Sequence, residues 1–256
     1  MTLFNKVILK NINLIESFFF IRYNKPYFHL RIRFFVSKNN DIYVIIKNMS
    51  IIVDNLYKEK KIWKIEIDTY TREVERYEAV PINIAELFFY KESFFLCEIL
   101  KRIKNHENIW HTVIWSIDTY LSCCNFDIQS KIDYVEAVGN SYKKEFGFNI
   151  HNSKSLSNVY RDNKLIVQKI LENEFEDEEW NNLSRIKKSH KSFCMDFFHF
   201  INNEKNINVK IKFIQSIIHM LNNRAFIYYN RLHEMIMYDF LLMFYKSKSA
   251  RSLSDN

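Results

Sequence analysis

The first third of the chain carries strand patterns, which are short runs rich in Phe, Tyr, Ile and Val that end at turn residues. Residues 17–23 and 28–36 are two such runs, and the Asn-Lys-Pro turn at 24–26 between them predicts a hairpin. Residues 62–70 form a third run of this kind. We therefore expect a small mixed or antiparallel sheet in the N-terminal third.

A helical pattern separates the second and third strand patterns. In residues 42–57 the apolar positions recur every three or four residues, and Asp41 is available as the N-cap. The order strand, strand, helix, strand predicts a sheet that a helix covers on one face.

From residue 81 onward the apolar spacing is mainly helical, and the polar stretch 151–163 is the best candidate for a loop. The predicted helices are 84–104, 111–124, 127–146, 164–171, 183–201 and 209–245, the last with a discontinuity near 222–229. No repeat or flexible linker divides the chain. We therefore expect a single α+β domain over residues 1–256, with a sheet-containing part at about 1–80 and a larger, mostly helical part at 81–256.

Composition narrows the function. The chain has only two glycines and two prolines, so glycine-rich loops that cradle phosphates are poorly supported. The net charge of +7 favours acidic partners, although most lysines are scattered and read as solvated surface. The sequence contains no RNA-binding signature, and we expect no direct contact with nucleic acid.

The cysteines and the hydropathy pattern point to a protein of the cytoplasm. Four cysteines occur without a CxxC pair or a Cys/His spacing, so neither zinc nor a disulfide framework is indicated, and we expect no cofactor. No run approaches the roughly 20 apolar residues of a membrane span.

Two arginines stand in the second strand pattern. Arg31 and Arg33 are two residues apart, so in a strand both side chains leave the same face, together with His29. Such a pair suggests an anion site. The alternative is an exposed strand face on which the arginines point to water.

Two further polar clusters interrupt apolar segments. Glu73 and Arg76 are three residues apart and can form an ion pair on a helical turn, which is often only surface decoration. His219 lies among Ile and Met and is followed by Asn223 and Arg224. A lone His on an apolar helix is more often an interior residue than a catalyst, but His is also the side chain best suited to transfer a proton at neutral pH.

These clusters belong to a larger resemblance. In order and spacing, the segments FIRYNKP (20–26), HLRIRF (29–34), TYTREVERY (69–77) and SIIHMLNNR (216–224) resemble the elimination domain of class I lantibiotic dehydratases, whose stand-alone form is the thiopeptide-type bacteriocin biosynthesis protein. The chain departs from the family pattern at Glu78-Ala79 and at Ile227, where glycines are usual.

The resemblance implies roles for the clustered residues. By motif alignment, the family's catalytic residues fall on Arg31, Arg33, Glu73, Arg76 and His219. We expect the neighbouring His29, Asn223 and Arg224 to bind substrate.

The resemblance also implies an activity. It would be a carbon–oxygen lyase that eliminates glutamate from glutamylated Ser or Thr of a ribosomally made precursor peptide, giving dehydroalanine or dehydrobutyrine. A separate protein that uses glutamyl-tRNA would have to attach the glutamate. Two alternatives remain open: a cycloaddition enzyme that forms the thiopeptide ring, and a non-catalytic subunit that binds the precursor peptide. Whether two copies pair into a homodimer also stays open.

Overall fold

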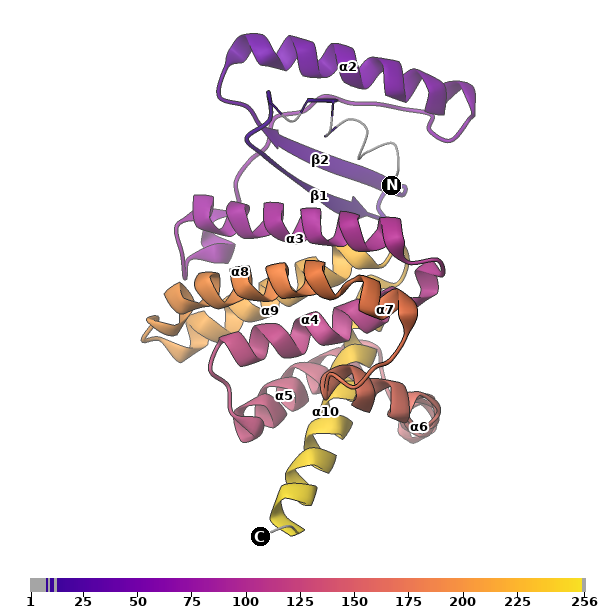
Figure 1. Ribbon diagram of the computed structural model, residues 1–256, viewed down its shortest axis with the longest axis vertical. Helices are drawn as coiled ribbons and strands as arrows, with labels where there is room; N and C mark the ends of the chain where they lie inside the picture. The colour runs from indigo at the N-terminus through magenta and orange to yellow at the C-terminus, as the bar shows by residue number, and fades with distance from the viewer. Residues whose placement is uncertain (1–7, 9, 12, 255–256) are drawn as a thin grey trace.

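The computed structural model describes residues 8, 10–11 and 13–254. A two-stranded sheet and a long helix, α2, occupy one end of the molecule, and the remaining helices stack below them (Figure 1). The predicted α+β class, with a small sheet packed on a larger helical part, is confirmed.

The sheet is the predicted hairpin. Strands β1 (Ser17–Tyr23) and β2 (His29–Phe35) pair antiparallel, so that Phe19 lies opposite Arg33 and Ile21 opposite Arg31. Paired residues share a face of the sheet. Phe19 and Ile21 pack against the main core of the helical part, and the strand arginines therefore lie on the face turned toward that part.

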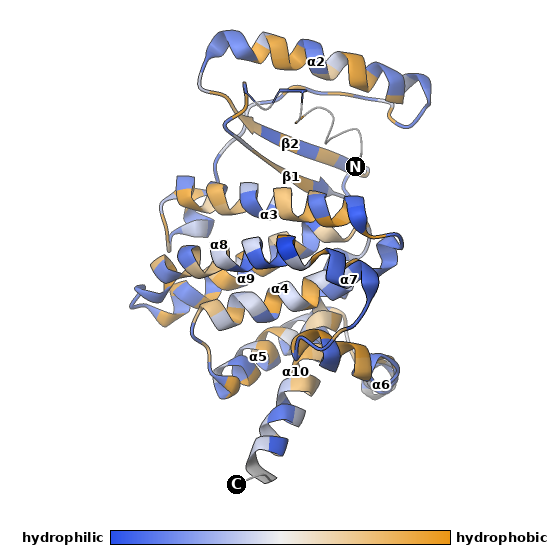
Figure 2. Cartoon of the chain, viewed as in Figure 1, coloured by the Kyte–Doolittle hydropathy of each residue, from blue (hydrophilic) through white to orange (hydrophobic). Residues whose placement is uncertain are grey.

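The opposite face of the hairpin packs beneath α2 (Asn39–Lys58), which begins before the predicted start at residue 42. Phe18 and Phe20 cluster there with Ile45, which is the single residue of α2 that is buried. Exposed apolar residues are frequent elsewhere on this helix (Figure 2).

The prediction of a third strand is wrong. Residues 62–70 form neither a helix nor a strand, and they pair with no strand in the described part of the chain. Their alternating apolar side chains face solvent, with Trp63 69% and Ile67 77% exposed. The period-two pattern is present, but the segment does not join the sheet, and one of the two sheet edges, that of β1, is already hydrogen-bonded to side chains of a helix.

The helical part contains two 3₁₀ turns and eight α-helices among the described residues, and no helix in that region is long and apolar enough to cross a membrane. In chain order, these 3₁₀ turns and α-helices are η1 (Val74–Tyr77), α3 (Ile82–Arg102), η2 (His106–Asn108), α4 (Ile109–Cys123), α5 (Ile128–Glu145), α6 (Ile150–Leu171), α7 (Glu178–Asn182), α8 (Ser184–Asn202), α9 (Ile207–Ala225) and α10 (Asn230–Ser254).

The predicted loop at 151–163 is also wrong, because these residues lie within α6. The segment is polar on most sides, yet Leu156 and Tyr160, four residues apart, are both buried. One narrow apolar stripe is enough to hold a surface helix against a core. The predicted discontinuity near 222–229 is confirmed, since α9 ends at Ala225 and α10 begins at Asn230.

Candidate active site

The side chain of Arg31 is held along β2 by its neighbours. Its guanidinium lies 4.0 Å from the ring centroid of Tyr23, and its Nε donates a hydrogen bond to His29 Nε2 at 3.2 Å. His29 in turn donates from Nδ1 to the carbonyl of Tyr27 at 2.8 Å. Both ring nitrogens of His29 are thus engaged within the hairpin, which makes His29 a support for Arg31.

Arg33 differs from Arg31 because one of its donors is unsatisfied. Its guanidinium lies 5.0 Å from the ring centroid of Tyr70, and its Nε is buried without a hydrogen-bond partner in the described chain. Leaving a buried donor unpaired costs on the order of 1–3 kcal/mol. Such a group is a candidate for binding an anion from outside the chain.

Glu73 and Arg76 form the predicted ion pair at the start of η1, with 3.3 Å between Glu73 Oε2 and Arg76 Nη1. Tyr70 contacts the Arg33 guanidinium and lies close enough to Glu73 to feel its charge. Burial raises the pKa of Tyr70, and the nearby carboxylates of Glu86 and Glu73 raise it further. Tyr70 therefore stays a neutral phenol. Its ring contacts the Arg33 guanidinium, and the negative charge of Glu73 acts on its hydroxyl group.

His219 projects from α9 and is paired with a residue that sequence reasoning missed. Its Nδ1 lies 2.9 Å from Oε2 of Glu234, a fully buried residue of α10, while the His219 side chain is 21% exposed. The two residues stand on different helices, so no helical spacing connects them. The only signal in the sequence was that Glu234 is one of two acidic residues in the otherwise largely apolar segment LHEMIMYDF (232–240).

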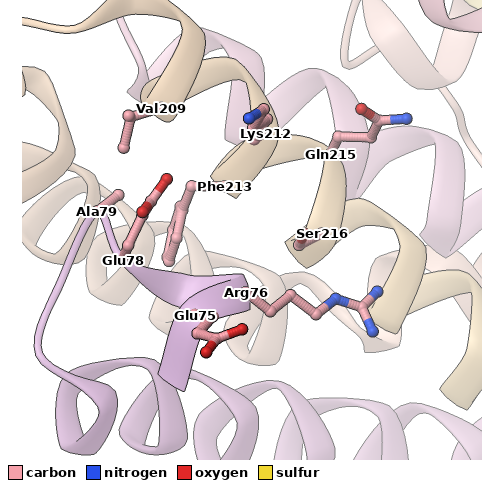
Figure 3. Close-up of a pocket in the computed structure, with 9 residues that line it drawn as sticks. All are labelled: Glu75, Arg76, Glu78, Ala79, Val209, Lys212, Phe213, Gln215 and Ser216. Atoms are coloured by element: carbon pink, nitrogen blue, oxygen red, sulfur yellow. The ribbon is translucent and has the colours of Figure 1, made fainter. Parts of the chain in front are cut away.

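A cavity of about 250 Å³ opens between η1 and α9. Figure 3 shows the Arg76 side chain extending from η1 to the side of Ser216 on α9. His219 follows Ser216 by three residues, which is one turn further along the same helix face. Of the predicted catalytic residues, Arg76 lines this cavity, whereas Arg31, Arg33, Glu73 and His219 are not among its lining residues.

The C-terminal end of α9 covers the free edge of β1. Asn223 accepts a hydrogen bond from the backbone N–H of Arg22 and donates one to its carbonyl, each at 2.8 Å, as a neighbouring strand would. Arg224 Nε donates to the carbonyl of Phe20 at 2.9 Å. These contacts place the C-terminal end of α9 beside the hairpin.

Arg224 cannot meet the expectation that it binds substrate, because its side chain is fully buried. Its guanidinium pairs with Glu92 of α3, which also accepts a hydrogen bond from Tyr120 at 2.9 Å. Tyr120 contacts His190 at 3.1 Å. The polar residues Arg224, Glu92, Tyr120 and His190 thus form a buried network that joins β1 to four helices. The amide of Asn223 is likewise occupied by the backbone of Arg22.

The described residues contain no group of three or more His, Cys, Asp or Glu side chains placed to hold a metal ion. The four cysteines are free, and burial raises the pKa of each thiol, to about 12 at Cys97. None of them is therefore a ready thiolate nucleophile near neutral pH. The predicted site residues with groups suited to anion binding or proton transfer are Arg31, Arg33, Arg76 and His219.

Comparison with known proteins identifies a family. The family model described as "Lantibiotic biosynthesis dehydratase C-term" matches residues 3–245. The fold is similar to the crystal structure of the tRNA-dependent lantibiotic dehydratase MibB from Microbispora sp. 107891, at 14% identity and a TM-score of 0.71. That match covers 96% of this chain and 26% of MibB, so the chain spans about a quarter of the length of MibB.

A second similar structure is the crystal structure of TsrL, with a TM-score of 0.61 and 10% identity. Here the match covers 97% of this chain and 89% of TsrL. The comparison with curated proteins gives no match.

Proposed function

The chain belongs to the lantibiotic biosynthesis dehydratase C-terminal family, and we propose that it eliminates glutamate from glutamylated Ser or Thr side chains of a precursor peptide. The reaction is a β-elimination that leaves dehydroalanine or dehydrobutyrine. Family membership supports a role in peptide dehydration during lantibiotic or thiopeptide biosynthesis. The arginines of β2, Arg76 at the cavity and the partly exposed His219 support the elimination step.

The reaction needs cationic groups that keep their charge. Negative charge develops on the amide oxygen next to Cα and on the departing glutamate. Arginine stays protonated over the working pH range and binds carboxylates through paired N–H donors. The observation that carries the proposal is the buried, unpartnered Nε of Arg33, which is a donor without an acceptor in the described chain. An anionic oxygen of the glutamyl ester would satisfy it.

The other residues complete the assignment. Arg31 contributes a second positive charge on the same face of β2. Glu73 orients Arg76, which reaches the cavity wall, and His219 transfers the proton. His29, Asn223 and Arg224 serve as positioning residues, since their polar atoms are engaged within the protein.

Glutamate must reach the peptide before it can be eliminated. MibB is a tRNA-dependent dehydratase and is about four times as long as this chain, which matches only 26% of it. We therefore assign the attachment of glutamate to a separate protein that uses glutamyl-tRNA, with this chain acting afterwards on the glutamylated peptide. Charged tRNA is a cytoplasmic reagent, which places the reaction in the cytoplasm.

A chemically glutamylated precursor peptide tests the proposal. Mass spectrometry should show loss of glutamate with the wild-type chain and persistence of the glutamylated peptide with His219→Ala. The matched control is His199→Ala, which removes an exposed histidine of α8 and should leave elimination unchanged. Full dehydration by His219→Ala would contradict the assignment. Glutamate retained on a tightly bound peptide would favour a binding subunit, and ring closure of a dehydrated peptide would favour the cycloaddition.

A further inference from the structure

Glu234 is unusual among the acidic residues because it is fully buried and its ion-pair partner is a histidine. In the described chain, His219 is the only basic side chain within ion-pair distance of its carboxylate. Tyr238 of the same helix donates a hydrogen bond to Glu234 Oε1 at 3.4 Å, and Tyr142 of α5 also hydrogen-bonds to this carboxylate. These partners hold the carboxyl group in place behind the imidazole.

This contact has a consequence for the protons of His219. A carboxylate only accepts hydrogen bonds, so the imidazole nitrogen that faces it must carry hydrogen. In a neutral ring, a proton on Nδ1 leaves a lone pair on Nε2. Nε2 has no hydrogen-bond partner among the described residues, and the side chain is partly exposed.

From this geometry we propose that Glu234 is a positioning residue that holds His219 in the Nδ1–H tautomer, so that Nε2 is the atom that exchanges a proton with substrate. The inference rests on the proposed function for its role in elimination, but the tautomer itself does not. The neutral ring then begins the reaction as a base.

His219 Nε2 takes the Cα proton, and the electrons of the Cα–H bond form the Cα=Cβ double bond. The Cβ–O bond breaks, and glutamate leaves with that electron pair as a carboxylate. The imidazolium then returns its proton from Nε2 to the glutamate or to water. Throughout, Glu234 keeps the Nδ1–H bond and stabilises the transient positive charge.

The tautomer can be read without substrate. In the ¹⁵N-labelled protein, the two ring nitrogens of His219, assigned with a His219→Gln variant, give long-range ¹H–¹⁵N correlations that distinguish Nδ1–H from Nε2–H. We expect Nδ1–H in the wild type. An Nε2–H ring in the wild type would overturn the inference, whatever the activity.

Two substitutions separate the hydrogen bond from the charge. Glu234→Gln can still accept from Nδ1 and should keep the tautomer while slowing elimination, because the imidazolium loses its counter-charge. Glu234→Leu removes the acceptor and should move the ring toward Nε2–H, with elimination slowed on the order of 10²-fold. The control Glu136→Gln removes one partner of the exposed Lys246–Glu136 pair and should change neither the tautomer of His219 nor the rate of elimination.

The outcomes are separable. If the Glu234→Leu variant kept the Nδ1–H tautomer of His219 and the wild-type rate of elimination, the positioning role of Glu234 would be refuted. A wild-type protein that shows Nδ1–H but releases no glutamate would contradict the proposed function and leave the tautomer assignment standing. If Glu234→Leu does not fold, the wild-type spectrum and the rate of Glu234→Gln still decide the question.

Discussion

Arg224 of α9 and Glu92 of α3 form an ion pair in which both side chains have 0% exposure. Burial raises the pKa of Glu92, and the charge of Arg224 and the hydrogen bond from Tyr120 act against that rise. Arg224 also donates to the carbonyl of Phe20 in β1. The pair therefore ties the hairpin to α3 and α9.

Breaking this pair should destabilise the protein strongly. Arg224→Leu leaves the Glu92 carboxylate buried without a counter-charge, which costs about 3–5 kcal/mol. The free energy of unfolding from urea titration measures the loss. Replacing both residues, as in Arg224→Met with Glu92→Leu, should recover much of it, because no charge is then left unpaired.

A surface pair provides the control for that experiment. Arg231 and Glu145 also form an ion pair, but each side chain is about half exposed, so Arg231→Gln should cost less than about 1 kcal/mol. An effect of Arg224→Leu as small as this would show that the buried pair contributes little to the fold.

Some parts of the fold could be predicted because the signal is local. The hairpin follows from Pro26 and the two flanking aromatic runs, and the break between α9 and α10 follows from the polar residues near 222–229. The third strand at 62–70 could not be rejected from sequence, because alternation of apolar residues does not show whether a segment finds a pairing partner. One of the two sheet edges, that of β1, is taken by Asn223, and nothing local in the sequence reveals this.

In the candidate site, too, local motifs mark some residues, whereas contacts between distant segments decide others. The assignment of Arg31, Arg33 and His219 rests on motif order, and their catalytic roles stay predictions. Arg224 was misread, because a motif cannot tell a cation that faces substrate from one that is buried against Glu92. Glu234 was missed because its pairing with His219 depends on how α9 and α10 cross.

Arg33 should affect elimination without stabilising the fold. Its Nε is buried and unpaired, so Arg33→Gln removes a desolvated donor and should leave the free energy of unfolding nearly unchanged. Elimination should fall on the order of 10²–10³-fold, as when one donor to a developing oxyanion is lost. Arg33→Lys should not restore it, because an ammonium cannot reproduce the planar set of N–H donors. Release of glutamate in single-turnover reactions, followed by mass spectrometry, measures both variants.

The matched control for Arg33 is Arg185→Gln, which removes an exposed arginine of α8 and the same unit of charge. It should leave both elimination and stability unchanged. Equal loss of activity in the two variants would mean that net charge matters for peptide binding and that Arg33 has no specific role.

His190 should make the fold sensitive to acid. Its ring stacks on Phe95 with 3.9 Å between centroids, and burial lowers its pKa to about 3, against about 6.5 for an unperturbed histidine. As the pH falls below about 6.5, His190 binds a proton in the unfolded chain, whereas in the folded chain it stays neutral until about pH 3. Stability contributed by the neutral ring is therefore present above about pH 6.5 and is lost progressively toward about pH 3.

Substituting His190→Gln should remove this contribution to the pH dependence, because glutamine does not titrate. Between about pH 6.5 and about pH 5, wild type should lose about 2 kcal/mol more of its free energy of unfolding than the variant. Urea titrations across this range compare the two slopes. His199→Gln, at an exposed position of the same helix, should keep the wild-type slope. Parallel slopes for wild type and His190→Gln would mean that the buried ring binds its proton as readily in the folded chain as in the unfolded one.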